Sequence, residues 1–320
     1  MTRLNLLEKV RDILTRAGFY VSELCSMRPI GFDLVARRDN SLLIIKVLTN
    51  VDGMSENVAV ELRTLSILLK ACPILIGERN SLGILEHDVV YDRFGIQAIT
   101  PYTLKNHLLE GIPLQVYAAP GGLYVNLDQE KIKYLRKEQN LSIGTFAQSL
   151  KVSRRTVQMY EEGMNTTVEV ALRIEDVLGG EVTIPIDILN AHTKKEVIQK
   201  KSPEVRGFQK FQAEIFSILK QVGYKVIPVE RAPFQALSQD KREILLTCVD
   251  RYDKKLIRKA QVIGSISNIT EKHAVIIPDK NINKTNIEGT PIIAKKELKK
   301  AREPEEIIDL IIARLYDKRK

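Results

Sequence analysis

The sequence predicts a multidomain protein in which two α/β domains flank a smaller helical domain. Three observations lead to this fold class. The chain has 320 residues, which is enough for two or three domains. Its first and last thirds share one succession of helices and strands, and its middle part has helically spaced apolar residues after a hairpin. With 44% hydrophobic and 28% charged residues, the composition is typical of a globular protein with its own core.

The first α/β domain begins with an amphipathic helix. Apolar residues from Leu6 to Ala17 keep helical spacing, and Gly18 ends this helix before a strand at 19–21. Two strands follow in GFDLVARRDNSLLIIKV at 31–47, and an apolar strand lies in CPILIGERN at 72–80. The segment GIQAITPYTLK closes the domain with a short strand and a helix. These elements predict a central sheet that is covered by helices.

The same succession returns in the last third of the chain. The segment ILKQVGYKV at 218–226 matches ILTRAGFYV at 13–21, with Gly223 in the place of Gly18. The likeness continues at 234–249, at 274–281 and in GTPIIAKKELK, which match 31–47, 72–80 and GIQAITPYTLK. We expect an internal duplication. The alternative is a chance similarity between two α/β segments.

A hairpin and four helices separate the two copies. The segment VYAAPGGLYVNL at 116–127 alternates around Pro-Gly-Gly, which is typical of a hairpin, and Asp128 is placed to cap the next helix. Helices are expected in QEKIKYLRKEQ, in SIGTFAQSLK after the cap Ser142, at 153–162 and in VEVALRIEDVLGG. The predicted domains are therefore 1–115, 116–190 and 208–320, with 191–207 as a basic, solvated linker.

The segment VSRRTVQMYEEG at 152–163 predicts a short helix with one buried face. Ser153 is expected to cap its N-terminus, and Gly163 is expected to end it in a left-handed conformation. Val157 and Tyr160 lie three residues apart, so they share the face that packs. The other faces carry Arg154, Arg155, Gln158 and Met159.

The run FAQSLKVSRRTVQMYEEG resembles the helix-turn-helix (HTH) of phage repressors, Cro proteins and XRE-type regulators, which have the lambda-repressor-like helical fold. The resemblance implies that the small Ala147 permits a close helix crossing, that Val152 fills the turn, and that Val157 is the core residue of the third helix. Arg136 and Glu161 match positions at which that family often has an internal ion pair. We expect this pair to be partly exposed and to orient the first helix on the third.

The resemblance also implies which residues meet DNA. The N-terminal end of the third helix would lie in the major groove, so Arg154 and Arg155 are expected to read guanines and Met159 to meet a thymine methyl group. Backbone contacts are expected from Lys137, Lys151, Ser153, Thr156 and Gln158. Ile143 departs from the family pattern, because many members have a polar, phosphate-binding residue there. The alternative interpretation is an arginine pair that serves only solubility.

The first α/β domain resembles the restriction-endonuclease-like fold of Holliday-junction resolvases. That resemblance implies a magnesium site made by an acid and a (D/E)-x-K motif, and Glu8, Asp33 and Lys46 fall at suitable positions. The second carboxylate should lie two residues before Lys46, where this chain has Ile44. We therefore expect these three residues to be vestigial, with no catalytic residues, no metal and no enzymatic activity.

Alternatives remain open for this domain. A migrated acid, such as Glu61, could restore the metal site and make the protein a magnesium-dependent, structure-specific or resolvase-like DNA nuclease. Asp33 could equally be a strand-end residue and Lys46 a snorkelling side chain. The second copy is expected to be more degenerate, since Gln235 and Cys248 align with Asp33 and Lys46.

The charge and composition of the chain limit the classes of partner that it is expected to bind. The formal net charge of +9 and the pI of about 9.3 favour an anionic partner, which is either nucleic acid or a membrane surface. The sequence has no run of 18 apolar residues and no signal-peptide core, so we expect a cytoplasmic protein without membrane association. The three cysteines lie outside any CxxC, and neither an HExxH nor a phosphate-binding loop occurs, so no disulfide and no cofactor is expected.

The whole arrangement resembles archaeal HTH-type transcriptional regulators over nearly the full chain. The resemblance implies binding of double-stranded DNA and control of transcription. A single HTH makes a small interface, so specific binding normally needs two modules on half-sites about 34 Å apart, and we expect a homodimer. The sequence identifies no small-molecule effector. A protein-interaction adaptor with a vestigial HTH is a further alternative.

Overall fold

The computed structural model describes residues 2–25, 30–190 and 210–315. The chain forms two compact units whose segments alternate along its N-terminal part. One unit contains residues 1–13, 48–53 and 74–191, and the other contains residues 14–47, 54–73 and 192–320. The linker predicted at 191–207 lies outside the described residues.

The N-terminal helix ends where the sequence predicts. Helix α1 (Arg3–Arg16) is followed by Gly18 with φ of +81°, a conformation that glycine adopts without steric strain. The next strands are β1 (Tyr20–Val21), β2 (Leu34–Arg38) and β3 (Ser41–Val47), which pair antiparallel in the order β1-β2-β3. Strand β3 is buried from Leu42 onward, and helix α2 (Glu56–Leu69) buries an apolar stripe that includes Leu62 and Leu65. These elements confirm the predicted helix and the strands at 31–47.

A second set of strands leads to the helical domain. The elements are the 3-10 turn η1 (Val51–Gly53), β4 (Cys72–Ile76), β5 (Val89–Arg93), β6 (Ile96–Ile99), α3 (Pro101–Leu109), β7 (Val116–Ala119), β8 (Gly122–Leu127) and β10 (Thr183–Ile184). The strand order is β4-β6-β5-β7-β8-β10. Strands β7 and β8 pair antiparallel around Gly121 and Gly122, which confirms the predicted hairpin.

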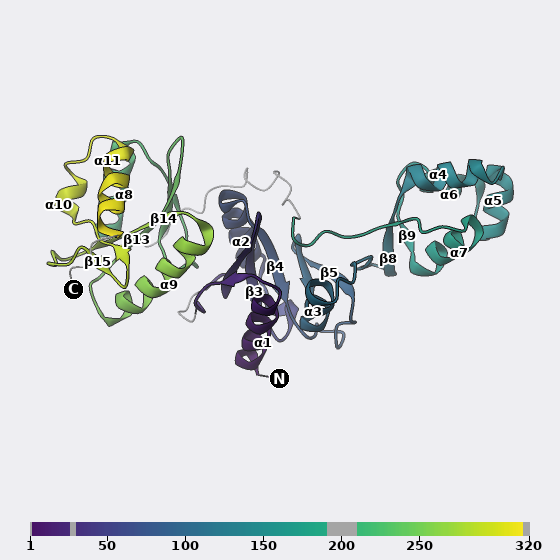
Figure 1. Ribbon diagram of the computed structural model, residues 1–320, viewed down its shortest axis with the longest axis horizontal. Coiled ribbons are helices and arrows are strands. Elements are labelled where there is room, and N and C mark those ends of the chain that lie inside the picture. Colours follow the sequence, from purple (N-terminus) through teal and green to yellow (C-terminus); the bar gives the residue numbers. More distant parts are fainter. Residues whose placement is uncertain (1, 26–29, 191–209, 316–320) are drawn as a thin grey trace. The chain divides into compact units, whose positions relative to one another are not determined.

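Four helices gather at the end of this hairpin, as Figure 1 shows. They are α4 (Gln129–Glu138), α5 (Ile143–Leu150), α6 (Arg154–Tyr160) and α7 (Val168–Leu178). Asp128 and Ser142 cap α4 and α5 as predicted, since their side-chain oxygens accept the N–H groups of Lys131 and Thr145, each at 3.0 Å.

The helical domain also contains strands that the sequence analysis did not predict. Strands β9 (Thr166–Thr167) and β10 pair with β8, and Val125 and Leu127 of β8 belong to the same core as Phe146. The predicted hairpin with four helices is therefore extended by these two strands. Two-residue strands are too short to show the alternation of apolar and polar residues by which strands are recognised.

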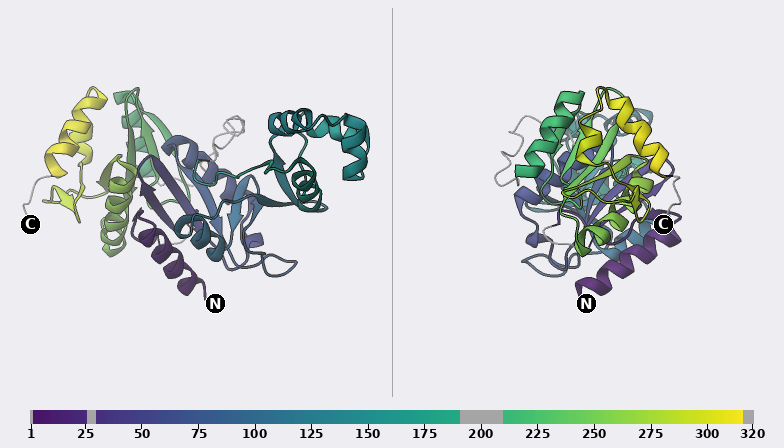
Figure 2. Two further views of the ribbon diagram at one scale, coloured as in Figure 1. Left: turned by 45° about the vertical axis from the view of Figure 1, so that its right-hand side comes forward. Right: turned by 90° about the vertical axis from the view of Figure 1, so that its left-hand side faces the viewer.

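The last part of the chain is a helix-covered sheet. It contains α8 (Lys210–Val222), β11 (Lys225–Pro228), β12 (Ala236–Gln239), β13 (Ile244–Asp250), α9 (Lys254–Thr270), β14 (His273–Pro278), β15 (Asn286–Ile287), β16 (Thr290–Pro291), α10 (Lys295–Leu298) and α11 (Pro304–Leu315). The order is β11-β12-β13-β14, with β13 and β14 parallel. Leu245 and Val249 share a core with α8, α10 and α11, whereas α9 covers the opposite face (Figure 1 and Figure 2).

Strands β1-β2-β3 and strands β11-β12-β13 each form a three-stranded antiparallel meander. An equivalent side-chain contact occurs in each of them. Asp33 donates its N–H to the carbonyl of Ile45 at 2.8 Å and accepts the N–H of Val47 on Oδ2 at 2.7 Å. Gln235 donates its N–H to the carbonyl of Thr247 at 3.0 Å and accepts the N–H of Val249 on Oε1 at 2.8 Å. In both meanders, the residue before the second strand thus holds the end of the third.

Candidate nucleic-acid interface

Helix α6 is a short helix with well-formed ends. The hydroxyl of Ser153 accepts the N–H of Thr156 at 3.0 Å, which satisfies a donor of the first turn. At the other end, Gly163 has φ of +99°, its N–H bonds to the carbonyl of Tyr160, and the N–H of Met164 reaches the carbonyl of Met159 at 2.8 Å. The predicted cap and the predicted left-handed end are therefore both present.

The inner face of α6 packs as the sequence indicates. Val157 and Tyr160 are buried in the core of the helical domain, and the Tyr160 hydroxyl accepts a hydrogen bond from Thr166 at 3.1 Å. Ala147 of α5 is buried in the same core, and the half-buried Val152 of the turn packs against it. Apolar contacts therefore set the angle between α5 and α6, and the outer face of α6 does not take part in them.

An ion pair ties α4 to the C-terminal end of α6. Arg136 donates from Nε to Glu161 Oε1 at 2.5 Å and from Nη2 to Oε2 at 3.1 Å, while its Nη1 reaches the carbonyl of Leu141 at 2.8 Å. The two side chains are only 9% and 10% exposed. The pair was expected to be partly exposed, and this expectation is wrong, because almost none of either side chain reaches water. Removing one partner of such a buried, bidentate pair would leave a charge out of water without its counter-charge, which costs more than the loss of a surface pair does.

The three residues proposed to read bases differ in their surroundings. Arg154 and Arg155 are exposed at the start of α6, and Met159 is half-buried one turn later. Arg155 Nη1 lies 4.0 Å from Glu162 Oε1, and both side chains are more than 60% exposed. A pair so open to water contributes about 0–1 kcal/mol, so it hardly hinders a move of Arg155 to another partner.

Arg154 has a neighbour that the sequence analysis missed. A Cβ atom on Gly144 of α5 would lie 3.1 Å from Arg154 Nε, 3.2 Å from Nη2 and 3.3 Å from Cζ. The guanidinium therefore rests over the bare backbone of Gly144, closer than a larger residue would allow. A glycine inside a helix costs stability relative to alanine, which is the one sequence signal that could have marked this position.

The candidates for backbone contacts are mostly exposed. Lys137, Lys151 and Gln158 are open to solvent, whereas the hydroxyls of Ser153 and Thr156 lie 2.8 Å apart and bond to each other. Ile143 is half-buried and packs against the core of the helical domain. Its departure from the family pattern thus replaces a phosphate contact with an apolar one.

The nuclease-like residues are not arranged as an open metal site. Asp33 is 1% exposed, its Oδ2 bonds to the N–H of Val47, and the same oxygen lies 3.6 Å from Lys46 Nζ. Lys46 also donates to the carbonyl of Ile30 at 3.1 Å. Glu8 is exposed on α1. Burial of the nearby Cys25 thiol raises its pKa to about 12, and the charge of Asp33 raises it by a smaller amount. This thiol is therefore a neutral group of the core.

The carboxylates that magnesium would need are not available there. Ile44, at the position of the second acid, is buried in β3. Glu61 does not restore the site, because its Oε1 accepts the backbone N–H groups of Glu230 and Arg231 and its Oε2 bonds to the Arg231 guanidinium at 3.2 Å. Among the described residues, no group of three or more His, Cys, Asp or Glu could hold a metal ion. These residues do not fit the magnesium ion of the nuclease fold.

Membrane insertion finds no support in the helices. In the part of the chain that the structure describes, no helix combines the length and the apolar character needed to cross a bilayer.

Two family patterns match the chain, and they correspond to the two kinds of domain. The PD-(D/E)XK superfamily domain matches residues 3–114, and the helix-turn-helix family matches residues 132–184. No solved structure matches the chain.

Relatives of known sequence match almost end to end. A protein of Methanosarcina acetivorans is 38% identical over 318 residues, which are 97% of this chain and 97% of the relative. A protein of Methanocella arvoryzae is 37% identical over 98% of this chain and 97% of its own length, and one of Halobacterium salinarum is 36% identical over 98% of both. Each is described as a "Putative HTH-type transcriptional regulatory protein".

We predict that Glu161→Gln destabilises the helical domain by about 3 kcal/mol, because it leaves the Arg136 guanidinium buried without its counter-charge. Hydrogen exchange of the α4 and α6 amides in the full chain measures this effect. The matched control is Glu162→Gln, which alters only an exposed pair and should change stability by less than about 0.5 kcal/mol. Equal exchange rates in the two variants would show that the ion pair does not hold α4 to α6.

Proposed function

Since the chain belongs to the family of archaeal HTH-type transcriptional regulatory proteins, we propose that it regulates transcription by binding a specific sequence of double-stranded DNA. The proposal assigns sequence reading to the segment 153–162, whose helical part is α6. The observation that carries it is the outer face of α6, where two arginines stand exposed on a helix that a buried ion pair fixes in place.

The roles follow from the chemistry of each side chain. Arg154 and Arg155 each offer a planar fork of donors that fits O6 and N7 of guanine, which discriminates by about 1–3 kcal/mol per good pair, and Met159 offers an apolar contact for thymine. Lys137, Lys151, Ser153, Thr156 and Gln158 are proposed to hold the DNA backbone, which sets register without reading sequence. The structural roles in this site fall to Arg136, Ala147, Val152, Val157, Glu161 and Gly163.

We further propose that the protein acts as a homodimer on a two-fold-symmetric site. Helix α6 has only seven residues, so one copy reaches few bases. Two copies on half-sites about 34 Å apart would supply the specificity that one copy lacks. Contact with the chromosome places the protein in the cytoplasm, and a small-molecule effector remains unassigned.

The domain organisation supports a regulator built on a duplicated fold. We propose domains at 1–115, 116–190 and 208–320, with the linker at 191–207 between the last two. The shared element order and the equivalent contacts of Asp33 and Gln235 support an internal duplication. In the proposed second copy, the amide oxygen of Gln235 accepts the same kind of backbone hydrogen bond as the carboxylate oxygen of Asp33, but it carries no charge.

A magnesium-dependent nuclease is the second candidate function, because residues 3–114 match the PD-(D/E)XK superfamily domain. The engagement of Asp33, Lys46 and Glu61 speaks against it. We therefore propose that the protein is not an enzyme and that the nuclease fold serves as a scaffold.

The central test is a selection of binding sites from genomic DNA with the full chain. Wild-type protein should enrich a two-fold-symmetric sequence, and Arg154→Ala/Arg155→Ala should lose that preference because its base contacts are gone. The comparison variant Lys137→Ala should weaken binding to all sequences alike and reduce the slope of log affinity against log salt concentration by about one. Wild-type protein that enriches no sequence would sink the proposed function.

Gly144→Ala should weaken binding to the selected site about tenfold or less without lowering the melting temperature. The new methyl group displaces the Arg154 guanidinium, which can move at little cost, while alanine gains up to about 1 kcal/mol of helix propensity. The matched test combines Gly144→Ala with Arg154→Ala, which should bind no worse than Arg154→Ala alone. Additive losses would mean that Gly144 acts on something other than Arg154.

The nuclease alternative predicts magnesium-dependent cleavage of linear, branched or four-way-junction DNA. We expect no cut strands on a denaturing gel. The variant Asp33→Asn keeps an oxygen that can accept the Val47 N–H, as Gln235 does in the other meander. It also removes the counter-charge of the buried Lys46, so a melting curve must first show that the variant is folded. Cleavage by the wild type that Asp33→Asn abolishes would transfer the function to this domain.

A further inference from the structure

The positive charge of this protein is not concentrated on its HTH. Residues 116–190 contain 8 Lys and Arg against 10 Asp and Glu, and residues 1–115 contain 13 against 13. Residues 210–315 contain 20 Lys and Arg against 14 Asp and Glu. The segment that carries the proposed reading helix is therefore slightly acidic, and the electrostatic attraction for a polyanion must come largely from elsewhere.

Four exposed cations lie close together on one surface of the last domain. It is formed by Arg251, Lys254, Lys255 and Arg258, which we name the α9 basic face. All four side chains are exposed, on the turn before α9 and its first two turns. In the described part of the chain, none of the four forms an ion pair, whereas their neighbour Lys259 is paired with Asp250.

The acids beside this face are already engaged. Asp253 caps α9 by accepting the N–H groups of Lys255 and Leu256 at 2.8 and 2.9 Å. Asp279 accepts the N–H of Tyr252 at 3.0 Å. These contacts hold the connection between β13 and α9 in place, so the cations project from a fixed corner of the domain.

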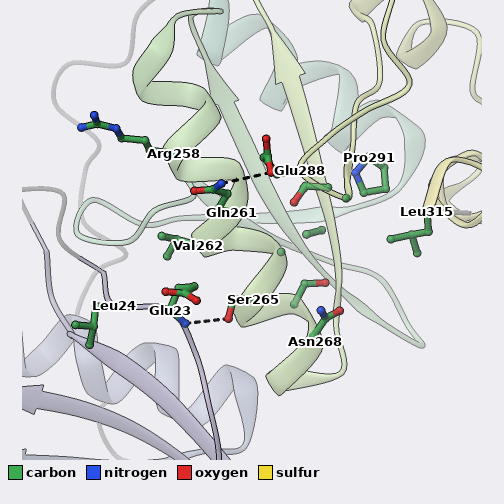
Figure 3. Close-up of a pocket in the computed structure, with 15 residues that line it drawn as sticks. Glu23, Leu24, Arg258, Gln261, Val262, Ser265, Asn268, Glu288, Pro291 and Leu315 are labelled. Atoms are coloured by element: carbon green, nitrogen blue, oxygen red, sulfur yellow. Dashed lines mark hydrogen bonds between the residues drawn. The ribbon is translucent and has the colours of Figure 1, made fainter. Parts of the chain in front are cut away.

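Glu288, which lines a pocket together with Arg258, also has a partner. Glu288 bonds through Oε2 to Gln261 Nε2 at 3.3 Å. Figure 3 shows Arg258 extended away from Gln261 and Glu288, at the edge of the pocket that these residues line. The guanidinium of Arg258 thus faces outward with its donors available.

Lys254 and Lys255 are not placed where they would stabilise helix α9. Lys254 and Lys255 occupy helix positions at which the positive end of the helix dipole disfavours cations. Helices α2, α4, α7 and α11 carry acids in their first turns instead. The lysines do not stabilise the helix on which they stand, so their charges are available for an external anion.

We propose that the α9 basic face binds the phosphate backbone of double-stranded DNA without reading sequence, as a second contact in addition to helix α6. The choice of DNA rests on the proposed function, because an HTH bound to its site keeps duplex phosphates at high local concentration around the rest of the chain. Beside these four cations, Ile257 is 37% exposed and Tyr252 is half-buried, which leaves little apolar surface to insert into a membrane.

The spacing of the cations suits a charged rod. Lys254 and Arg258 are one helical turn apart, and duplex DNA presents a phosphate charge every 1.7 Å or so along its axis, so neighbouring cations can each meet a phosphate. Each such contact releases counterions, which makes the affinity depend on salt.

The test uses the full chain and the triple variant Lys254→Gln/Lys255→Gln/Arg258→Gln. Affinity is measured from low to moderate KCl concentration for the selected site and for random duplex DNA. The slope of log affinity against log salt should become shallower by about two to three on both DNAs, at about 0.9 for each lost contact. The ratio of the two affinities should stay the same, because this surface reads no sequence.

The matched control is Lys296→Gln/Lys300→Gln/Arg302→Gln, which removes the same charge from exposed positions on and after α10, on the α8 side of the sheet. It should change the slope by less than one. Equal changes of slope in the two triple variants would mean that only the net charge of the protein matters, which would overturn the proposal. An unchanged slope in the α9 variant would overturn it as well. Stronger dependence on these residues for single-stranded RNA than for duplex DNA would also overturn it. Melting curves show whether each variant is folded.

The outcomes separate this inference from the proposed function. Wild-type protein with no sequence preference, but with a salt slope that the α9 variant reduces, would refute sequence-specific reading and leave this surface standing. A strong sequence preference of the wild type, together with an unaltered slope in the α9 variant, would support sequence-specific reading and refute binding by the α9 basic face.

Discussion

The bidentate pair of Arg136 and Glu161 is the constraint on which the proposed DNA-reading helix depends. Helix α6 has seven residues, too few to be stable without its neighbours. Its apolar face supplies Val157 and Tyr160 to the core, and its C-terminal end is fastened by a nearly buried guanidinium that also bonds to the carbonyl of Leu141. With both ends fixed, the backbone that carries the exposed arginines keeps one orientation, which reduces the conformational entropy lost on binding.

Affinity and specificity have different physical sources in this chain. The helical domain carries slightly more acids than bases, so Arg154 and Arg155 act in a region without a strong positive field. A short reading helix of this kind discriminates between sequences through hydrogen-bond geometry, whereas attraction to DNA in general depends on accumulated charge. The largest excess of bases over acids lies in residues 210–315, which include the α9 basic face.

The nuclease-like fold illustrates how one contact outlasts the chemistry around it. In the first meander, a carboxylate oxygen of Asp33 accepts the N–H of Val47; in the second, the amide oxygen of Gln235 accepts the N–H of Val249. Both oxygens satisfy the same kind of buried donor, so the fold needs the acceptor but not the charge. Magnesium needs the charge, and the other acidic position is Ile44 while Glu61 is bound to Arg231. These residues therefore satisfy backbone donors but do not fit a magnesium site.

The sequence by itself determined the elements and their ends. Helical spacing located α1, α4 and α8, Ser153 and Asp128 marked helix starts, and the spacing around Val157 identified the HTH, because these signals depend on residues within a few positions of each other. The strands β9 and β10, the burial of the Arg136–Glu161 pair, the binding of Glu61 to Arg231 and the seat of Arg154 on Gly144 were decided only by the tertiary structure. Each joins residues far apart in the chain, and such contacts depend on the packing of whole elements, which no local pattern records.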